Sequence, residues 1–302
     1  MTKVLLTGGS GFIAAHTLEQ LLEKDYSVVT TVRSEEKAQK IRGAHTDQVE
    51  AGKLEVLIVP DIAQEGAFDE VALHASGSSV KRVVITSSFA SIVDEAHFTD
   101  PAKTFTEADW NPVQLEDINR SPAAAYRASK KLAELAAWDF VSENKPSFDL
   151  VTICPPMVFG PAVPYFATLD GINTSNERVV SLLRGDWKAE IPASRPVPMW
   201  IDVRDAARAH IRALEEPSAG GQRLLTTPGN FSNREIADIV RAKFPEFADK
   251  LPGPEVPGGE FPPEDQVFKI DNSVTKKLLG FEWITLEKSI TDLVTSLKEH
   301  GI

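Results

Sequence analysis

The sequence predicts an α/β fold, a Rossmann-type doubly wound parallel sheet with a smaller, discontinuous C-terminal domain. Three observations predict it. Strand-like and helix-like segments alternate through residues 4–59, as in parallel sheets with crossover helices. A glycine-rich turn over residues 8–14 joins the first strand to the first helix. Tyr126 and Lys130 stand four residues apart in a later helical segment, downstream of a Thr-Ser-Ser run.

The N-terminal elements follow one another in a regular order. Residues 4–7 form a short apolar strand, which we expect to be buried. Residues 12–24 carry apolar side chains at helical spacing, and residues 26–32 form a β-branched strand. Residues 35–42 are polar and helix-forming, and residues 54–59 form a third strand.

The later elements complete the sheet and add the second domain. Further apolar strands are expected at residues 82–86, 150–154 and 224–227. The strongest helix begins at Ser121, a good N-cap followed by proline, and ends near Lys145. We expect the larger domain at residues 1–160 plus 200–227, and the smaller one at residues 161–199 plus 228–302.

One connection is too short for the fold. Only about twenty residues separate Pro60, which ends the third strand, from Arg82, which begins the next, whereas each parallel crossover takes a dozen or more. One helix, near residues 65–74, fits in that space. A further strand with its own helix does not.

Composition and charge narrow the classes of partner. The chain has 302 residues and a formal net charge of −12, from 32 basic and 44 acidic side chains. A negative surface disfavours nucleic acid and anionic membranes. Cys154 is the only cysteine, the six histidines show no metal spacing, and no signal peptide is evident. We therefore expect a cytoplasmic protein with a small-molecule ligand and no bound metal.

The glycine turn favours a dinucleotide. Gly8, Gly11 and Ala14 are spaced three apart, and small residues there permit a tight turn and close approach of the backbone to a pyrophosphate. The helix that follows, opening with Phe12 and Ile13, offers free N–H groups to the anion. An ordinary flexible turn is the alternative, but the flanking strand and helix favour dinucleotide binding.

The end of the second strand selects between NAD and NADP. NAD sites usually place an acid there, whereas an arginine suits the additional phosphate of NADP. Residues 30–34 hold Arg33 and no acid, and Lys37 follows one helical turn later. A solvated surface arginine is the alternative, but the pattern favours NADPH.

Tyr126 and Lys130 suit acid catalysis, because positions i and i+4 share one helix face. A nearby cation loosens the proton of a phenol, which can then protonate a carbonyl oxygen that receives a hydride. A hydroxyl of residues 86–88, after a strand, can hydrogen-bond that carbonyl. Each feature alone also fits chance, but their order along the chain favours catalysis. Four side chains are candidates for a substrate pocket: Phe89, Val93, Tyr165 and Phe166.

With these motifs the chain resembles the extended short-chain dehydrogenase/reductases, in the branch of dihydroflavonol reductases and fungal NADPH-dependent carbonyl reductases. The segments that carry the resemblance cover nearly the whole chain: residues 6–14, 31–34, 82–88, 126–130, 155–161, 200–205 and 276–281.

The resemblance implies that NADPH reduces an aldehyde or ketone to an alcohol. It assigns proton donation to Tyr126, the nicotinamide ribose to Lys130, and orientation of the carbonyl to Ser88, with Ser87 the less favoured choice. The implied cofactor contacts, besides Tyr126 and Lys130, are Gly8, Gly11, Phe12, Ile13, Arg33, Lys37, Asp61, Ile62, Pro155, Val158 and Ser175.

The chain departs from this family in one place. The family carries an extra strand after Asp61, then a turn beside the cofactor and a long helix, which together amount to about forty residues more than this chain has. Either the sequence omits a segment or the protein has a real deletion. An omission predicts a chain break or an implausibly long jump near residues 70–77.

Two other functions remain open. A sugar-nucleotide epimerase or dehydratase on the same fold would normally use NAD and an acid near Val32. A non-enzymatic NADPH-binding regulator would not need the Tyr126–Lys130 pair. The physiological carbonyl is not evident from the sequence, and both a monomer and a homodimer are compatible with it.

Overall fold

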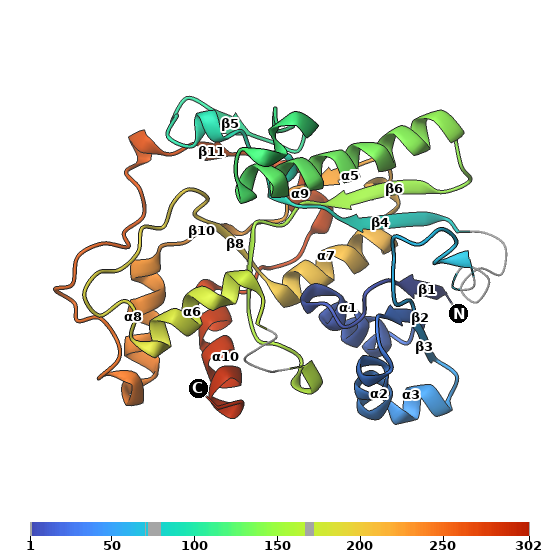
Figure 1. Ribbon diagram of the computed structural model, residues 1–302, viewed down its shortest axis with the longest axis horizontal. Coiled ribbons are helices and arrows are strands. Elements are labelled where there is room, and N and C mark those ends of the chain that lie inside the picture. Colours follow the sequence, from blue (N-terminus) through green and yellow to red (C-terminus); the bar gives the residue numbers. More distant parts are fainter. Residues whose placement is uncertain (1, 70, 72–79, 167–171, 302) are drawn as a thin grey trace.

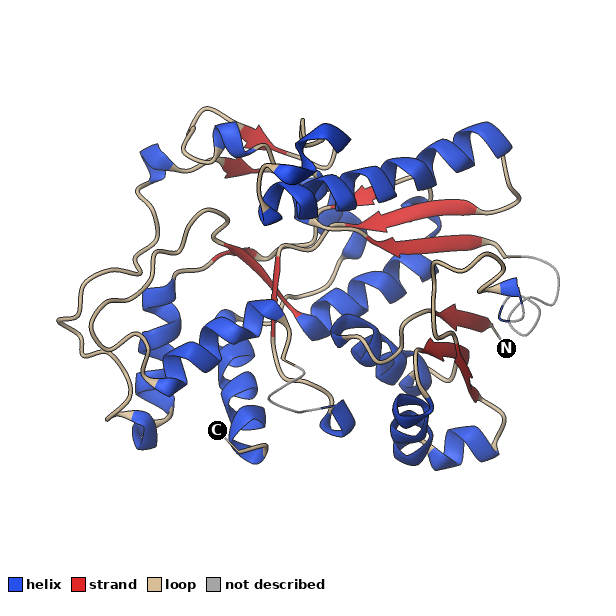
Figure 2. Ribbon diagram, in the orientation of Figure 1, coloured by secondary structure: helices blue, strands red, loops and turns tan. Residues whose placement is uncertain are grey.

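The computed structural model describes residues 2–69, 71, 80–166 and 172–301 (Figure 1). Helices lie on both faces of parallel strands (Figure 2), which confirms the predicted Rossmann-type α/β class. Within the described residues, however, the six strands expected in one parallel sheet form two groups of three and not one continuous sheet.

The N-terminal half-sheet has three parallel strands in the order β1-β2-β3. They are β1 (Lys3–Leu6), β2 (Ser27–Val32) and β3 (Leu54–Ile58). The accompanying helices are α1 (Phe12–Glu23), α2 (Glu35–Ala44) and α3 (Thr46–Glu50). Their inner faces pack as the periodicities predict, since Leu18, Leu21, Val28 and Ile41 are all buried.

The second half-sheet is also parallel, in the order β4-β6-β9. Its strands are β4 (Arg82–Thr86), β6 (Asp149–Ile153) and β9 (Arg223–Leu224). Helix α5 (Pro122–Asn144) joins β4 to β6, and the Ser121 hydroxyl caps it by accepting a hydrogen bond from the Ala124 amide. Lys145 ends the helix in the left-handed conformation, with φ of 46°.

Helix α7 (Val203–Glu215) holds the two half-sheets together. Figure 1 shows it between α1 and the strands β4 and β6, and it packs against all three. On the α1 side, the Gln20 amide donates to the Arg204 carbonyl at 2.9 Å. On the other side, His210 Nε2 lies 2.7 Å from Thr86 Oγ1.

The remaining elements form the body at the left of Figure 1. A mixed sheet there has the order β10-β8-β7, with strands β7 (Met157–Phe159), β8 (Met199–Asp202) and β10 (Gly229–Asn230). The helices around it are α6 (Thr174–Arg184), α8 (Asn233–Lys243) and α10 (Leu286–Glu299). Two further strands, β5 (Thr104–Phe105) and β11 (Lys269–Ile270), pair near α9 (Ser273–Leu279). The division of the chain into two domains stays a prediction.

The structure contradicts one expectation about the first strand and leaves another, about residues 70–77, largely untested. The first strand is not buried as predicted, because Lys3 and Leu5 are exposed and their neighbours Val4 and Leu6 are only partly covered. The predicted break or long jump near residues 70–77 falls, apart from Val71, outside the described residues.

Candidate functional site

The glycine turn after β1 has the geometry that a pyrophosphate needs. Gly8 adopts φ of +70°, which disfavours other residues. A Cβ on Gly9 would lie 2.1 Å from Thr30 Oγ1, so this position also requires glycine. Gly11 is the N-cap of α1, and no side chain caps the helix there. The Gly8, Gly9 and Gly11 amides are donated within the protein, so the group left for an anion is the uncapped, positive end of α1, which fits a dinucleotide.

The predicted 2′-phosphate side chains stand beside this turn, after β2. Arg33 and Lys37 are both exposed, and within the described residues neither has a salt bridge. By contrast, the two acids that open α2 are engaged: Glu35 pairs with Arg42 at 2.9 Å and Glu36 with Lys40 at 3.1 Å. The guanidinium and ammonium groups are therefore the free charges at this corner, which fits NADPH better than NAD.

The predicted adenine contacts follow β3. Asp61 and Ile62 are exposed, Ile62 to 60%. The Asp61 carboxylate accepts a hydrogen bond from the Ala63 amide at 2.9 Å, which fixes the turn. An exposed aliphatic side chain at the carboxyl end of a parallel strand offers a flat ring an apolar contact.

The structure brings two of the three predicted catalytic groups into contact and places the third one helical turn away. The Tyr126 hydroxyl donates to Ser88 Oγ across 3.5 Å, a long hydrogen bond. Tyr126 is 52% exposed, and Lys130 follows one turn later on α5 and is partly buried. Ser88 is the second residue after β4, and its hydroxyl caps a short 3₁₀ helix, Phe89–Ser91, by accepting a hydrogen bond from the Ala90 amide. A carbonyl oxygen placed between the two hydroxyls would contact both.

Ser87 cannot share this role in the observed arrangement. Its side chain is buried and donates to the carboxylate of Glu134, and it also lies 3.3 Å from the Ser91 hydroxyl. Only Ser88, of these two serines, faces Tyr126. The geometry therefore favours the choice of Ser88 that the resemblance implies.

Next to Ser87 and Ser91 lies a buried polar cluster that the sequence analysis did not identify. Glu134 on α5 is 1% exposed and accepts hydrogen bonds from Arg223, Thr152 and Ser91, each at 2.7 Å. The Arg223 guanidinium also stacks 3.6 Å from the Trp110 ring centre. The cluster ties α5 to β6, β9 and the segment after β4. The sequence did contain a sign of this cluster, because Glu134 follows Lys130 by four residues, just as Lys130 follows Tyr126.

Burial and charge set the protonation of this cluster. Burial would raise the pKa of Glu134, but the hydrogen bonds and charge of Arg223 outweigh it and hold that pKa below its ordinary value. Cys154 lies in the same interior, and burial, with the nearby Glu134 charge, raises the pKa of its thiol to about 12. Glu134 is therefore ionised and Cys154 is an inert thiol at neutral pH.

Of three further predicted cofactor contacts, Pro155 lies beside the segment that follows Ser88, and Val158 and Ser175 contact each other. The Pro155 carbonyl, just after β6, accepts a hydrogen bond from the Phe89 amide at 2.9 Å. The Ser175 hydroxyl accepts one from the Val158 amide at 3.1 Å. Pro155 and Val158 are buried, and Ser175 is partly exposed. Their role toward a nicotinamide stays a prediction.

The predicted substrate residues lie elsewhere. Phe89 and Val93 are each 2% exposed in a core with Phe105, so they do not face a substrate as predicted. Tyr165 donates to Glu19 at 2.6 Å, and its ring and that of Phe166 pack on the core of the N-terminal half-sheet. These contacts place the two rings against α1 and α2, and not beside the Ser88–Tyr126 pair.

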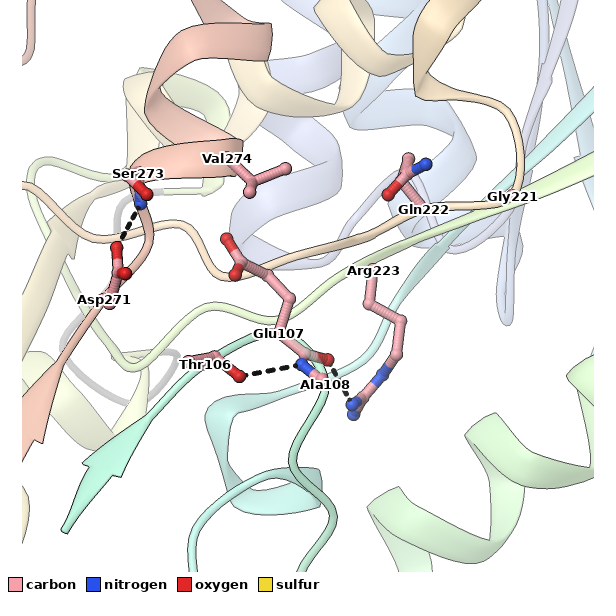
Figure 3. A pocket seen from close by; sticks show the side chains of 9 residues that line it. All are labelled: Thr106, Glu107, Ala108, Gly221, Gln222, Arg223, Asp271, Ser273 and Val274. Carbon is pink, nitrogen blue, oxygen red and sulfur yellow. Dashed lines mark hydrogen bonds between the residues drawn. The ribbon is translucent and has the colours of Figure 1, made fainter.

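A separate polar cavity of about 410 Å³ lies at the outer edge of the second half-sheet (Figure 3). Its walls come from the residues after β5, those leading into β9, and the start of α9: Thr106, Glu107, Ala108, Gly221, Gln222, Arg223, Asp271, Ser273 and Val274. Figure 3 shows the Arg223 side chain turned toward the Glu107 backbone carbonyl, to which it donates a hydrogen bond at 2.6 Å. The cavity adjoins β9, on the far side of β6 from β4, and belongs to a different part of the molecule from Ser88.

Two kinds of feature are absent from the described residues. No three histidine, cysteine or acidic side chains there are grouped so as to hold a metal ion. Among the described helices, none combines the length and apolar character needed to cross a membrane.

Known proteins resemble this chain in sequence and in fold over nearly the whole length of both. The family described as "NAD dependent epimerase/dehydratase family" matches residues 4–225. The chain is 38% identical to the ketoreductase azaE of Aspergillus niger, over 99% of this chain and 98% of that one. It is 33% identical to the NADPH-dependent methylglyoxal reductase GRE2 of Saccharomyces cerevisiae, over 97% of both. The structure of Gre2 from Candida albicans in complex with NADPH superposes with a TM-score of 0.85, at 32% identity and 100% coverage of both chains.

The alignment with the Aspergillus protein also measures the missing length. The alignment has 341 positions, but 99% of this chain is only about 299 residues. About forty positions of the alignment therefore have no residue in this chain. That shortfall has the size of the missing strand and helix. The motifs, the fold and these matches agree, and the chain belongs to the NAD dependent epimerase/dehydratase family, within the extended short-chain dehydrogenase/reductases.

Proposed function

We propose that the protein is an NADPH-dependent carbonyl reductase that converts an aldehyde or ketone to an alcohol. The observation that carries the proposal is the approach of Tyr126 to Ser88, with Lys130 one turn away and the glycine turn and Arg33 on the other half-sheet. The names of the fungal relatives, a ketoreductase and a methylglyoxal reductase, support the same chemistry.

Each catalytic side chain has a distinct task in this proposal. The Ser88 hydroxyl binds the carbonyl oxygen and fixes its direction. The Tyr126 hydroxyl donates its proton to that oxygen as the alcohol forms. The Lys130 ammonium binds the ribose and stabilises the phenolate that remains. NADPH supplies the hydride when it is bound.

The alternatives have less support. An epimerase or dehydratase would need an acid free at the end of β2, but Glu35 and Glu36 are both in ion pairs. A regulator without activity would not need the intact Ser88, Tyr126 and Lys130. We infer further that the enzyme works in the cytoplasm as a monomer or homodimer. The unpaired, buried Cys154 is compatible with a reducing compartment.

A substrate panel tests the proposed function directly. We expect the protein to oxidise NADPH in the presence of at least one class among aliphatic aldehydes, vicinal diketones and aryl ketones. The loss of NADPH absorbance measures the reaction. No oxidation with any class, together with NAD that copurifies with the protein, would instead favour an epimerase.

Replacing Arg33 should impair the use of NADPH selectively. We expect Arg33→Ala to raise the KM for NADPH by about tenfold to a hundredfold, because a charge-assisted contact to phosphate contributes about 1.5 to 3 kcal/mol. The KM for NADH should change little. Lys40→Ala is the matched control, since Lys40 lies nearby on α2 and its charge pairs with Glu36. Equal effects of Arg33→Ala on both cofactors would exclude a phosphate contact.

A further inference from the structure

The Glu134 carboxylate holds the chain on both sides of Ser88. Its Oε2 accepts hydrogen bonds from the hydroxyl of Ser87, just before Ser88, and from that of Ser91, three residues beyond it, at 2.7 Å. Glu134, Ser87 and Ser91 are each at most 5% exposed. The Ser91 hydroxyl and amide also lie 2.8 and 3.0 Å from the Ser88 carbonyl oxygen. One carboxylate oxygen therefore anchors the short turn that carries Ser88.

The other oxygen of the same carboxylate is fixed to the sheet. Oε1 of Glu134 accepts hydrogen bonds at 2.7 Å from Thr152 on β6 and from Arg223 on β9. Burial alone would raise the pKa of Glu134, but the hydrogen bonds and charge of Arg223 keep it ionised. An ionised carboxylate only accepts hydrogen bonds, so it directs the proton of the Ser87 hydroxyl into the interior.

Glu134 also belongs to the helix that carries the proposed proton donor. It follows Tyr126 by eight residues on α5, which is about 12 Å along the helix axis. A helix keeps this separation nearly constant, because its own backbone hydrogen bonds fix each turn. The bond from Glu134 to the Ser88 turn thus sets where Ser88 lies relative to Tyr126. The two hydroxyls are 3.5 Å apart, so even a small shift of the turn would separate them.

We infer that Glu134 is a positioning residue, which acts through Ser87 and Ser91 to aim the Ser88 hydroxyl at the carbonyl oxygen of the substrate. The inference rests on the proposed function, in which Ser88 binds that oxygen. A displacement of about 1 Å in a positioned group can slow a reaction by about a hundredfold. Loosening the anchor should therefore slow turnover, whereas NADPH binding should change little because the glycine turn and Lys130 remain.

Removing one anchoring hydroxyl tests the inference without leaving Arg223 unpaired. We expect Ser91→Ala to lower kcat for carbonyl reduction by about tenfold, with a nearly constant Kd for NADPH, because one of the two anchors is lost. Ser194→Ala is the matched control. Ser194 is 2% exposed, and its hydroxyl donates to the Gly259 carbonyl at 2.8 Å, beside the start of α8. The control should leave kcat within about twofold, even where its loss of stability is similar.

A Ser88→Ala background shows whether the effect passes through Ser88. If the anchor acts only by aiming the Ser88 hydroxyl, Ser91→Ala should change kcat by less than about twofold once that hydroxyl is absent. A merely structural role would instead lower kcat by the same factor in both backgrounds. Equal factors, or a kcat that Ser91→Ala leaves unchanged in the wild type, would overturn the inference.

Crystal structures give a further test that does not depend on turnover. In the double variant Ser87→Ala/Ser91→Ala, the distance from Ser88 Oγ to the Tyr126 hydroxyl should lengthen by about 1 Å or more, because both anchors are gone. An unchanged distance would overturn the inference. A longer distance in the variant, together with a wild type that reduces no carbonyl, would support the positioning role and contradict the proposed function.

Discussion

Replacing Tyr126 by phenylalanine should lower kcat for carbonyl reduction by about a hundredfold to ten-thousandfold, the range that a positioned general acid contributes. The change removes only the hydroxyl that lies 3.5 Å from Ser88 Oγ. The ring is 52% exposed, so its loss of one oxygen should leave the fold intact. The Kd for NADPH, measured by fluorescence titration, should stay nearly constant because Lys130 and the glycine turn remain.

Tyr26→Phe is the matched control for this variant. The Tyr26 hydroxyl donates to Glu215 at 3.0 Å, at the far end of α7, so its removal should leave kcat nearly unchanged. If Tyr126→Phe retained most of the activity, the proposed proton donor would be wrong. If it lost NADPH binding in the same proportion as turnover, Tyr126 would act in cofactor binding and not as an acid.

The N-terminal elements could be predicted from sequence because local patterns determine them. The helical spacing of Leu18 and Leu21 and the β-branched run of 27–32 led to the elements that the structure contains. The glycine turn could also be predicted from sequence, because the spacing of its small residues is local. The structure adds a reason for Gly9, where a Cβ would collide with Thr30 on β2. The proximity of Tyr126 to Ser88 followed from order along the chain and from the family resemblance.

What could not be predicted depends on contacts between distant segments. The family resemblance favoured Ser88 over Ser87, but the reason lies in Glu134, which holds the Ser87 hydroxyl in the interior and which the sequence analysis did not identify. Phe89 was expected in a pocket, but packing with Phe105 places it in the core, and hydrophobicity alone does not separate these two outcomes. Leu5 is 38% exposed although its strand is a continuous apolar run, because burial depends on which distant segments pack against the strand.

The buried Glu134–Arg223 pair should be the most sensitive point for stability. We expect Glu134→Ala to lower the free energy of unfolding by about 3 to 5 kcal/mol at pH 7, because it leaves the buried Arg223 guanidinium without its carboxylate partner. Urea unfolding followed by circular dichroism measures the effect. Glu143→Ala, on the exposed surface near the end of α5, should change the free energy by less than about 0.5 kcal/mol.

The pH dependence distinguishes the ion pair from a simple loss of packing. The pKa of Glu134 is lower in the folded protein than in the unfolded chain. The ion pair therefore adds its full contribution to the free energy of unfolding above the unfolded pKa of about 4.3, and this contribution is lost as pH falls through the folded pKa. The difference in stability between the wild type and Glu134→Ala should therefore shrink progressively below about pH 4.3. A difference that stays constant down to pH 3 would show that the carboxylate contributes through packing and not through its charge.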